Sequence, residues 1–336
     1  MAVGDTLPHC TGTGTSADPY IYTTAQGFIE AIAVVSAYVK AGEENLVFDA
    51  NDGVIPQSGI VIYNSFLNGR GTTILNLLKQ NTEGNLVELN YGTYDQRHTI
   101  EVRNMNFYNM TIINNNGQNS TFVRAFPADY FQEYFINCNF SGIVRGSNVA
   151  ANALFYHGNS YSGRSGYKCY QNCTFNINFD CSTTNTITMF SCDFGGTLEN
   201  CTICASGTIK ETGDTNQILT LVSGFSLKDT TFVNKETNPL YPYRTGYTSF
   251  VNLNISAVDT SYNYFKIYLK SKVAGTYPRL SVSNASKLLV NRSRIEGGDI
   301  TGTCISMQET DTTASDYIYN ADNLVNAGFL VVSVIE

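Results

Sequence analysis

The sequence predicts an all-β chain folded as a right-handed parallel β-helix, a β-solenoid of short stacked strands, with one short capping helix near the N-terminus. Three observations predict it: the composition, a single helical segment, and a recurring four-residue strand motif. Of 336 residues, 43% are hydrophobic and only 14% are charged. The polar surface must therefore come from Asn, Thr, Ser, Gly and Tyr, which suit strands and turns better than exposed helices.

One amphipathic helix is expected after the turn-rich opening segment. Thr23 and Gln26 have the spacing of a capping box. Apolar residues then recur at i, i+4, i+7 and i+11, and Gly42 stands where a residue just beyond a helix end is common; these residues are Phe28, Ile32, Val35 and Val39. We expect about four helical turns within an N-terminal cap that spans residues 1–45.

A recurring tetrad is the strongest internal signal. It consists of a small polar residue, a residue of buried type, a polar residue and an aromatic or branched residue. Alternation along a strand places its second and fourth residues on one face, which we expect to be buried. The predicted interior ladder consists of Met105, Phe107, Cys138, Phe140, Cys173, Phe175, Cys192, Phe194, Cys201, Thr230 and Phe232.

The intervals between the tetrads vary, as expected of a solenoid with insertions, and we assign residues 46–326 to the β-helix. Residues 327–336 read as a very apolar strand that pairs with a neighbour or closes the last coil, since an exposed strand of this kind would promote aggregation. Two groups of residues are candidate interfaces, although the tyrosines would also suit sugar stacking: Tyr241, Tyr243 and Tyr247, and Phe329, Leu330 and Val332.

The Asn-Cys-x-Phe tetrads resemble the coils of pectate-lyase-like right-handed β-helix proteins, in which Asn, Cys and Phe stack from coil to coil. The segment 14–24, followed by an amphipathic helix, is similar to the N-terminal cap of many members, often bacteriophage virion proteins. The resemblance implies the fold over most of the chain. It does not by itself imply a chemistry, because this fold hosts lyases, hydrolases, adhesins and inert spacers.

Two short motifs match known binding patterns but have simpler structural explanations. Residues 12–17 match the letters of a dinucleotide fingerprint, but no strand precedes them and Pro19 stands where a phosphate-binding helix would start. Cys201 and Cys204 have CxxC spacing, and further cysteines lie upstream, so a structural zinc site is an alternative. An interior ladder explains Cys201 together with Cys138, Cys173 and Cys192, because free Cys packs as a small hydrophobe.

This sequence contains only weak matches to known catalytic arrangements of residues. No histidine has a second His or a carboxylate at metal-ligand spacing, which excludes HExxH-type zinc chemistry, and His157 is only faintly similar to the motif of pectin hydrolases. A hydrolytic groove would need two carboxylates a few ångströms apart. The candidates, if stacking brings them together, are Glu133, Asp180, Asp193, Glu199 and Asp229. We predict no catalytic, cofactor-binding or metal site.

Charge and targeting signals restrict the partners. The net charge is −8 and no basic run exists, which disfavours nucleic-acid binding. The first apolar stretch is too short to cross a membrane, and the first residues lack the basic region of a secretory signal. Nine cysteines, an odd number, favour a reducing site of folding.

These observations favour a structural component of a bacteriophage virion: a capsid decoration, head-fibre or tail-surface protein assembled in the bacterial host cytoplasm. Its partners would be other virion proteins, and a homotrimer would cover exposed strand edges. The first alternative is a tailspike-type protein that binds or degrades host-surface polysaccharide. Tailspikes of this family commonly carry a distinct N-terminal particle-binding domain, whereas the cap here begins almost at Met1, which disfavours this alternative. A bacterial adhesin is a third possibility and would require an export signal.

Overall fold

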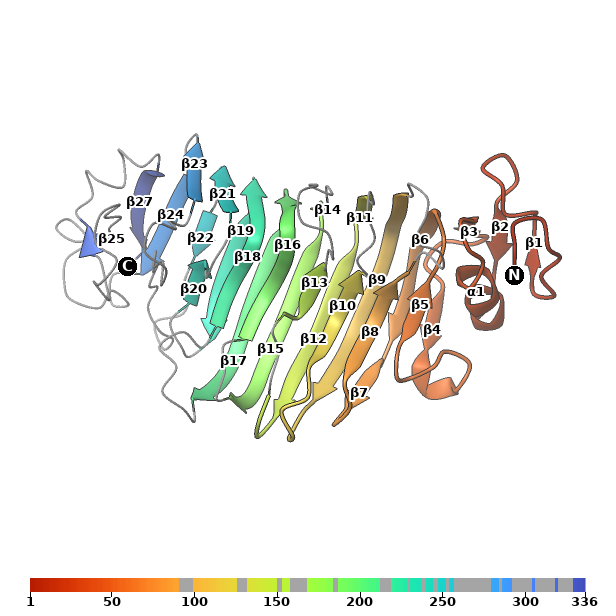
Figure 1. Cartoon of the computed structure of the whole chain (residues 1–336), viewed down its shortest axis with the longest axis horizontal. Coiled ribbons are helices and arrows are strands. Elements are labelled where there is room, and N and C mark those ends of the chain that lie inside the picture. The colour runs from red at the N-terminus through yellow and green to blue at the C-terminus, as the bar shows by residue number, and fades with distance from the viewer. Residues whose placement is uncertain are drawn as a thin grey trace.

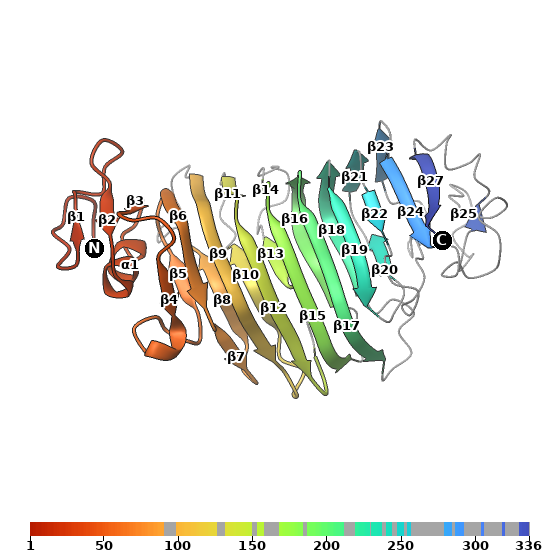
Figure 2. The same cartoon turned by 180° about the vertical axis from the view of Figure 1, so that it is seen from behind.

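The computed structural model is an elongated stack of parallel strands, with the N- and C-termini at opposite ends (Figure 1). The same order of strands is seen from behind (Figure 2). The structure describes residues 1–90, 99–125, 132–149, 153–157, 168–183, 187–211, 219–228, 230–236, 240–243, 247–251, 254–256, 279–283, 286–291, 304–305, 318–319 and 329–335. The prediction of a mostly β chain built from parallel strands is confirmed.

The strands form three ladders. The first ladder contains β2 (Tyr20–Tyr22), β3 (Tyr38–Ala41), the starts of β6 (Phe66–Leu75) and β9 (Thr99–Ile113), β11 (Gln132–Ile136), β14 (Lys168–Gln171), the ends of β16 (Ile187–Glu199) and β18 (Leu219–Lys228), β21 (Tyr247–Val251) and β23 (Arg279–Ser283). β1 (Cys10–Thr11) pairs antiparallel with β2 at its N-terminal edge.

The second ladder contains β4 (Val47–Asp49), the remainders of β6 and β9, β12 (Asn139–Gly146), β15 (Thr174–Thr183), β17 (Thr202–Glu211), β19 (Thr231–Glu236), β22 (Asn254–Ser256), β24 (Ser286–Asn291) and β27 (Phe329–Ile335), with β7 (Leu78–Gln80) beside the end of β9. The third contains β5 (Ile60–Ile62), β8 (Gly84–Leu89), β10 (Ser120–Ala125), β13 (Phe155–His157), the starts of β16 and β18, and β20 (Leu240–Tyr243). Separately, β25 (Cys304–Ile305) and β26 (Ile318–Tyr319) form an antiparallel pair.

The helix α1 (Ala25–Ile32) is shorter than the sequence predicts. Thr24, rather than Thr23, is the N-cap, and its hydroxyl accepts a hydrogen bond from Gly27 N at 3.1 Å. The predicted four turns are wrong, because the chain turns at Ser36, where φ is +59°, and then enters β3. Val39 satisfies the helical spacing, but its buried side chain belongs to a strand.

α1 and a 3-10 turn, η1 (Ala50–Asp52), belong to the N-terminal end of the stack. The Phe28 ring of α1 is fully buried and packs edge-on against Tyr22 at 5.2 Å and beside Phe48 at 5.9 Å. The three rings thus pack against one another at the N-terminal end of the stack. No helix in the ranges that the structure describes is long and apolar enough to span a membrane.

The interior contains one aromatic stack for each ladder. In the second ladder, Phe140 lies between Phe107 and Phe175, with centroid separations of 5.4 and 5.1 Å and nearly parallel rings. The other stacks are Phe135 with Tyr170 and Phe155 with Phe190. The three stacks meet edge to face in the centre, as at 4.8 Å between Phe175 and Phe190. Stacked contacts within a ladder and edge-to-face contacts between ladders are both arrangements that the ring quadrupoles favour.

A row of short donors lies beside the aromatic stack of the second ladder. We call one passage of the chain through the three ladders a coil. Each donor bonds to a carbonyl of the first-ladder strand one coil earlier: Cys138 Sγ to Val102 O (3.5 Å), Cys173 Sγ to Phe135 O (3.2 Å), Cys201 Sγ to Tyr170 O (3.3 Å) and Thr230 Oγ1 to Leu198 O (3.1 Å). Met105 precedes them and is buried. Burial raises the pKa of the Cys173 and Cys201 thiols well above the ordinary value.

Part of the predicted ladder lies elsewhere. The backbone of Cys192 pairs with His157 of β13, so the register places it in the third ladder, not in the row of Cys173 and Cys201. Phe194 follows in the stretch where the register of β16 against β18 shifts. The tetrad letters alone could not separate these ladders, because every buried strand alternates in the same way. Phe232 is in register with Ile203, in the continuation of the row of Phe107, Phe140 and Phe175.

We expect Phe140→Ala to lower the free energy of unfolding by about 3–5 kcal/mol, because it leaves a cavity where the three aromatic stacks meet. Phe140→Leu retains most of the buried volume and should cost about half as much. Guanidinium denaturation followed by circular dichroism checks both values. Equal stabilities of the wild type and Phe140→Ala would contradict the central position of this ring.

Candidate functional site

The turn from the first ladder to the second is made in the same way in successive coils. Asn104, Asn137, Asn172 and Asn200 each precede the buried second residue of a tetrad, and each has a left-handed backbone with φ between +51° and +54°. Asn is one of the few residues other than Gly that adopts this conformation readily. The sharp turn directs the Asn side chain outward and the next side chain into the core.

These asparagines form a hydrogen-bonded row, which we call the outer Asn row, beginning at Asn68. The Nδ2 of each donates to the Oδ1 of the asparagine one coil earlier, at 3.0, 3.1, 3.1 and 2.7 Å along the row Asn68, Asn104, Asn137, Asn172 and Asn200. The partners are separated by 36, 33, 35 and 28 residues. The row therefore holds its register although the coils differ in length.

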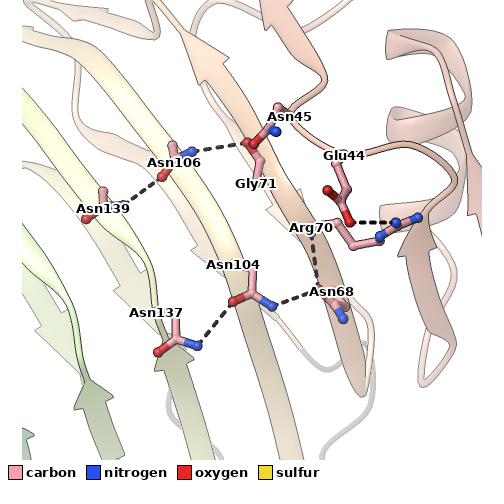
Figure 3. A pocket seen from close by; sticks show the side chains of 9 residues that line it. All are labelled: Glu44, Asn45, Asn68, Arg70, Gly71, Asn104, Asn106, Asn137 and Asn139. Atoms are coloured by element: carbon pink, nitrogen blue, oxygen red, sulfur yellow. Dashed lines mark hydrogen bonds and ion pairs between the residues drawn. The ribbon is translucent and has the colours of Figure 1, made fainter.

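A second row runs beside the first. Asn139 Nδ2 donates to Asn106 Oδ1 at 2.8 Å, and Asn106 Nδ2 donates to Gly71 O at 3.1 Å (Figure 3). Gly71 has φ +87°, and an added Cβ would meet Asn45 Oδ1 at 2.4 Å. Glycine at this position therefore leaves room for the Asn45 amide beneath it.

The two rows line an open groove of about 440 Å³ near the N-terminal end, bordered by Arg70 and Glu44 (Figure 3). The Arg70 guanidinium is fixed by an ion pair with Glu44 at 2.9 Å and by donation to Gly42 O at 2.9 Å. The Asn amides and the Arg70–Glu44 pair can donate hydrogen bonds to, and accept them from, a ligand rich in hydroxyl or amide groups. Of the nine described residues that line the groove, Glu44 alone is a carboxylate, so hydrolysis by a pair of carboxylates has no basis there.

The candidate acidic groove is not assembled by the residues that the structure describes. Glu133 is buried in β11, whereas the Asp180 side chain is 76% exposed and lies 3.8 Å from Arg145. Glu199 accepts a hydrogen bond from Gln171 on the first ladder. Asp193 lies in β16, where its side chain is not described, and Asp229 lies outside the described residues. The hypothesis that stacking gathers Glu133, Asp180 and Glu199 is wrong.

The structure instead reveals a buried network around His157. Its Nδ1 lies 3.1 Å from Glu133 Oε2, and its Nε2 lies 2.6 Å from the Tyr170 hydroxyl. Glu133, His157 and Tyr170 are all fully buried. The order carboxylate, imidazole and hydroxyl would suit proton transfer, but a substrate cannot reach a group with no exposed surface. We interpret the network as structural, since it satisfies polar groups inside the core.

Sequence reasoning missed this network. One signal was available, because His157 follows Phe155 at the spacing that places both residues on one face of a strand. The sequence distances from His157 to Glu133 and to Tyr170 do not indicate contact. The three side chains meet only because of the register between adjacent coils. Within the described ranges, no group of three or more His, Cys, Asp or Glu side chains is arranged to hold a metal ion.

The tyrosines predicted as an interface fall on two ladders. Tyr241 and Tyr243 pair through the backbone with Thr220 and Val222 in the third ladder, whereas Tyr247 pairs with Arg279 in the first. Phe329, Leu330 and Val332 belong to β27, which is parallel to β24. Their role as interface residues stays a prediction.

No protein-family model, curated protein or solved structure matches this chain. The resemblance to pectate-lyase-like proteins therefore stays a prediction based on the tetrads and the segment 14–24. A functional conclusion has to rest on the geometry of the ladders, the groove and the buried network.

We expect Asn137→Ala to lower the free energy of unfolding by about 2–3 kcal/mol, through the loss of two row hydrogen bonds and the cost of a left-handed alanine. Asn137→Gly loses the hydrogen bonds but tolerates the backbone, so it should cost about 1 kcal/mol less. Urea denaturation of the two variants separates the terms. The prediction fails if glycine is the more damaging substitution.

We expect Glu133→Ala to destabilise the chain by about 3–5 kcal/mol, because it leaves buried His157 without its carboxylate partner. Asp180→Ala is the matched control, since it removes a carboxylate from an exposed pair and should change stability by less than about 1 kcal/mol. Thermal denaturation at neutral pH compares the two. Similar effects from both substitutions would argue against a structural role for the buried network.

Proposed function

We propose that this protein is a structural component of a bacteriophage virion, a capsid decoration, head-fibre or tail-surface protein whose shaft is a closed, right-handed parallel β-helix. The observation that carries this proposal is the three-ladder stack, which extends along one axis with its outer amides bonded to each other. Such a body is a rigid spacer whose length grows with each coil.

The order of the strands supports the closed coil. The chain passes from the third ladder to the first and then to the second, for example through β10, β11 and β12, and repeats this order through β13, β14 and β15. Each strand pairs in parallel with its counterpart one coil later. Parallel strands connected by a crossover are almost always right-handed. α1, over the aromatic rings at the first layer, would then be the cap of the helix.

A structural role also fits the chemistry of the site. The His157 network is sealed in the core, and Glu44 is the single carboxylate among the described residues that line the groove. The thiols of Cys138, Cys173 and Cys201 are free and buried, which suits assembly in the reducing cytoplasm of a bacterial host. The virion setting itself rests on the resemblance of the segment 14–24 and the tetrads to phage β-helix proteins.

The test is direct detection in particles. Phage particles from a culture that carries this gene, purified on a density gradient, should contain the chain at a fixed copy number by quantitative mass spectrometry. Immunogold labelling should place it on the capsid or tail surface. Its absence from purified, infectious particles would refute the virion proposal.

The amide-lined groove favours one second candidate, a tailspike-type protein that binds host-surface polysaccharide. Asn side chains and the fixed Arg70 can bond to sugar hydroxyls along the stack. We expect Arg70→Asn, which suits the left-handed backbone at this position, to weaken polysaccharide binding at least about tenfold, equivalent to 1.4 kcal/mol. Arg145→Asn, on β12 outside the groove, is the matched control.

Calorimetry against a panel of bacterial capsular and wall polysaccharides measures this binding, and the release of reducing ends reports cleavage. Binding that Arg70→Asn alone reduces supports the groove. If no polysaccharide in the panel binds, the glycan-binding candidate is rejected and the proposed role as a rigid shaft is unaffected.

A further inference from the structure

The two ends of the stack offer different strand edges. At the N-terminal end, the first strands β4, β5 and β7 contain three residues each, and β2 is covered by the two-residue antiparallel β1. Short edge strands and an antiparallel cover are the usual means of preventing edge-to-edge pairing. This end is therefore a poor template for a further strand.

The C-terminal end has the opposite character. β27 contains seven residues, Phe-Leu-Val-Val-Ser-Val-Ile, of which six are apolar and none is charged. In the described part of the chain, β24 is its only partner, and β27 lies beyond β24 at the C-terminal end of the stack (Figures 1 and 2). A seven-residue uncharged strand at a sheet edge is a strong template for β pairing.

The register distinguishes the positions along β27. Val332 is in register with Leu288, Ile255, Phe232 and Ile203, in the continuation of the buried Phe row. Its neighbour Val331 is in register with Lys287 and Asn254, in the row that contains the exposed Thr202 nearer the middle of the stack. Ser333 is on the same face of the strand as Val331. Substitutions at Val331 and Ser333 therefore spare the interior row.

We propose that β27 pairs antiparallel with β27 of a second copy about a two-fold axis, which joins two stacks tail to tail in one continuous sheet. The strand is self-complementary in this arrangement: centred on Val332, it places Phe329 opposite Ile335 and Val331 opposite Ser333, with no like charges facing each other. Head-to-tail pairing lacks a matching edge at the N-terminal end. This inference goes beyond the virion proposal and does not depend on it.

The test uses the full chain and a charge swap. Sedimentation equilibrium of the wild type at micromolar concentration should give twice the chain mass. A variant with Val331→Glu and Ser333→Glu places like charges opposite each other across the axis and should be monomeric, with dimerisation weakened at least about a hundredfold. A variant with Val331→Lys and Ser333→Lys should behave in the same way, whereas an equimolar mixture of the two should restore the dimer. Thr202→Glu, in the same outward row far from the edge, should leave the wild-type dimer unchanged.

Circular dichroism melting of each variant verifies that it is folded, and hydrogen exchange should show protection of the amides of residues 329–335 in the dimer and its loss in the monomeric variants. A wild type that stays monomeric, a trimer, or a dimer that survives both charge variants would each overturn the proposal. A mixture that stays monomeric would overturn the antiparallel two-fold pairing.

Discussion

The structure depends on one constraint: at the turn from the first ladder to the second, one residue must adopt a left-handed backbone while the next enters the core. Asn104, Asn137, Asn172 and Asn200 meet the first condition. Asn can meet it at low cost, and its amide also bonds to the coil before and the coil after. A single residue type thus solves a conformational problem and fixes the stacking register.

The residue that follows the turn meets the second condition: it is Met105 after Asn104, and Cys or Thr in the later coils. From Cys138 onward this residue is small and donates to a carbonyl that the turn leaves in the core, because a buried carbonyl without a partner is costly. Cys138, Cys173 and Cys201 do this through their thiols, and Thr230 does it through a hydroxyl. The shared geometry explains why Thr can take the place of Cys in this row, and it accounts for these cysteines without a metal ion.

The same constraint determines how much could be predicted. The repeated Asn-Cys-x-Phe letters predict strands with one buried face, and Phe107, Phe140 and Phe175 do stack in the core. The first coils escaped detection because they vary the letters: the register aligns Phe48 and Ile74 with Phe107, and Gly71 replaces Asn at the turn.

What could not be predicted depends on contacts between coils of unequal length. Cys192 has the tetrad letters but pairs with His157 in the third ladder. Glu133 reads as a surface carboxylate, and only the stacking of β11 on β14 beside β13 brings it to His157 and Tyr170. Similarly, Val39 fits a helical period but lies in β3, because two turns of α1 already bring the chain back to the sheet.

The bonding within the Asn rows also explains why the groove is a weaker basis for a function than the stack. Asn104 and Asn137 each donate to one neighbour and accept from another, so a ligand would have to compete with bonds that already fix the register. The capacity for recognition is therefore concentrated at Arg70 and Glu44, whose ion pair lies at the margin of the rows. Because the amides of the row already bond to each other, their main effect is to stiffen the stack. A binding site on the row would therefore be confined to the end where the row begins.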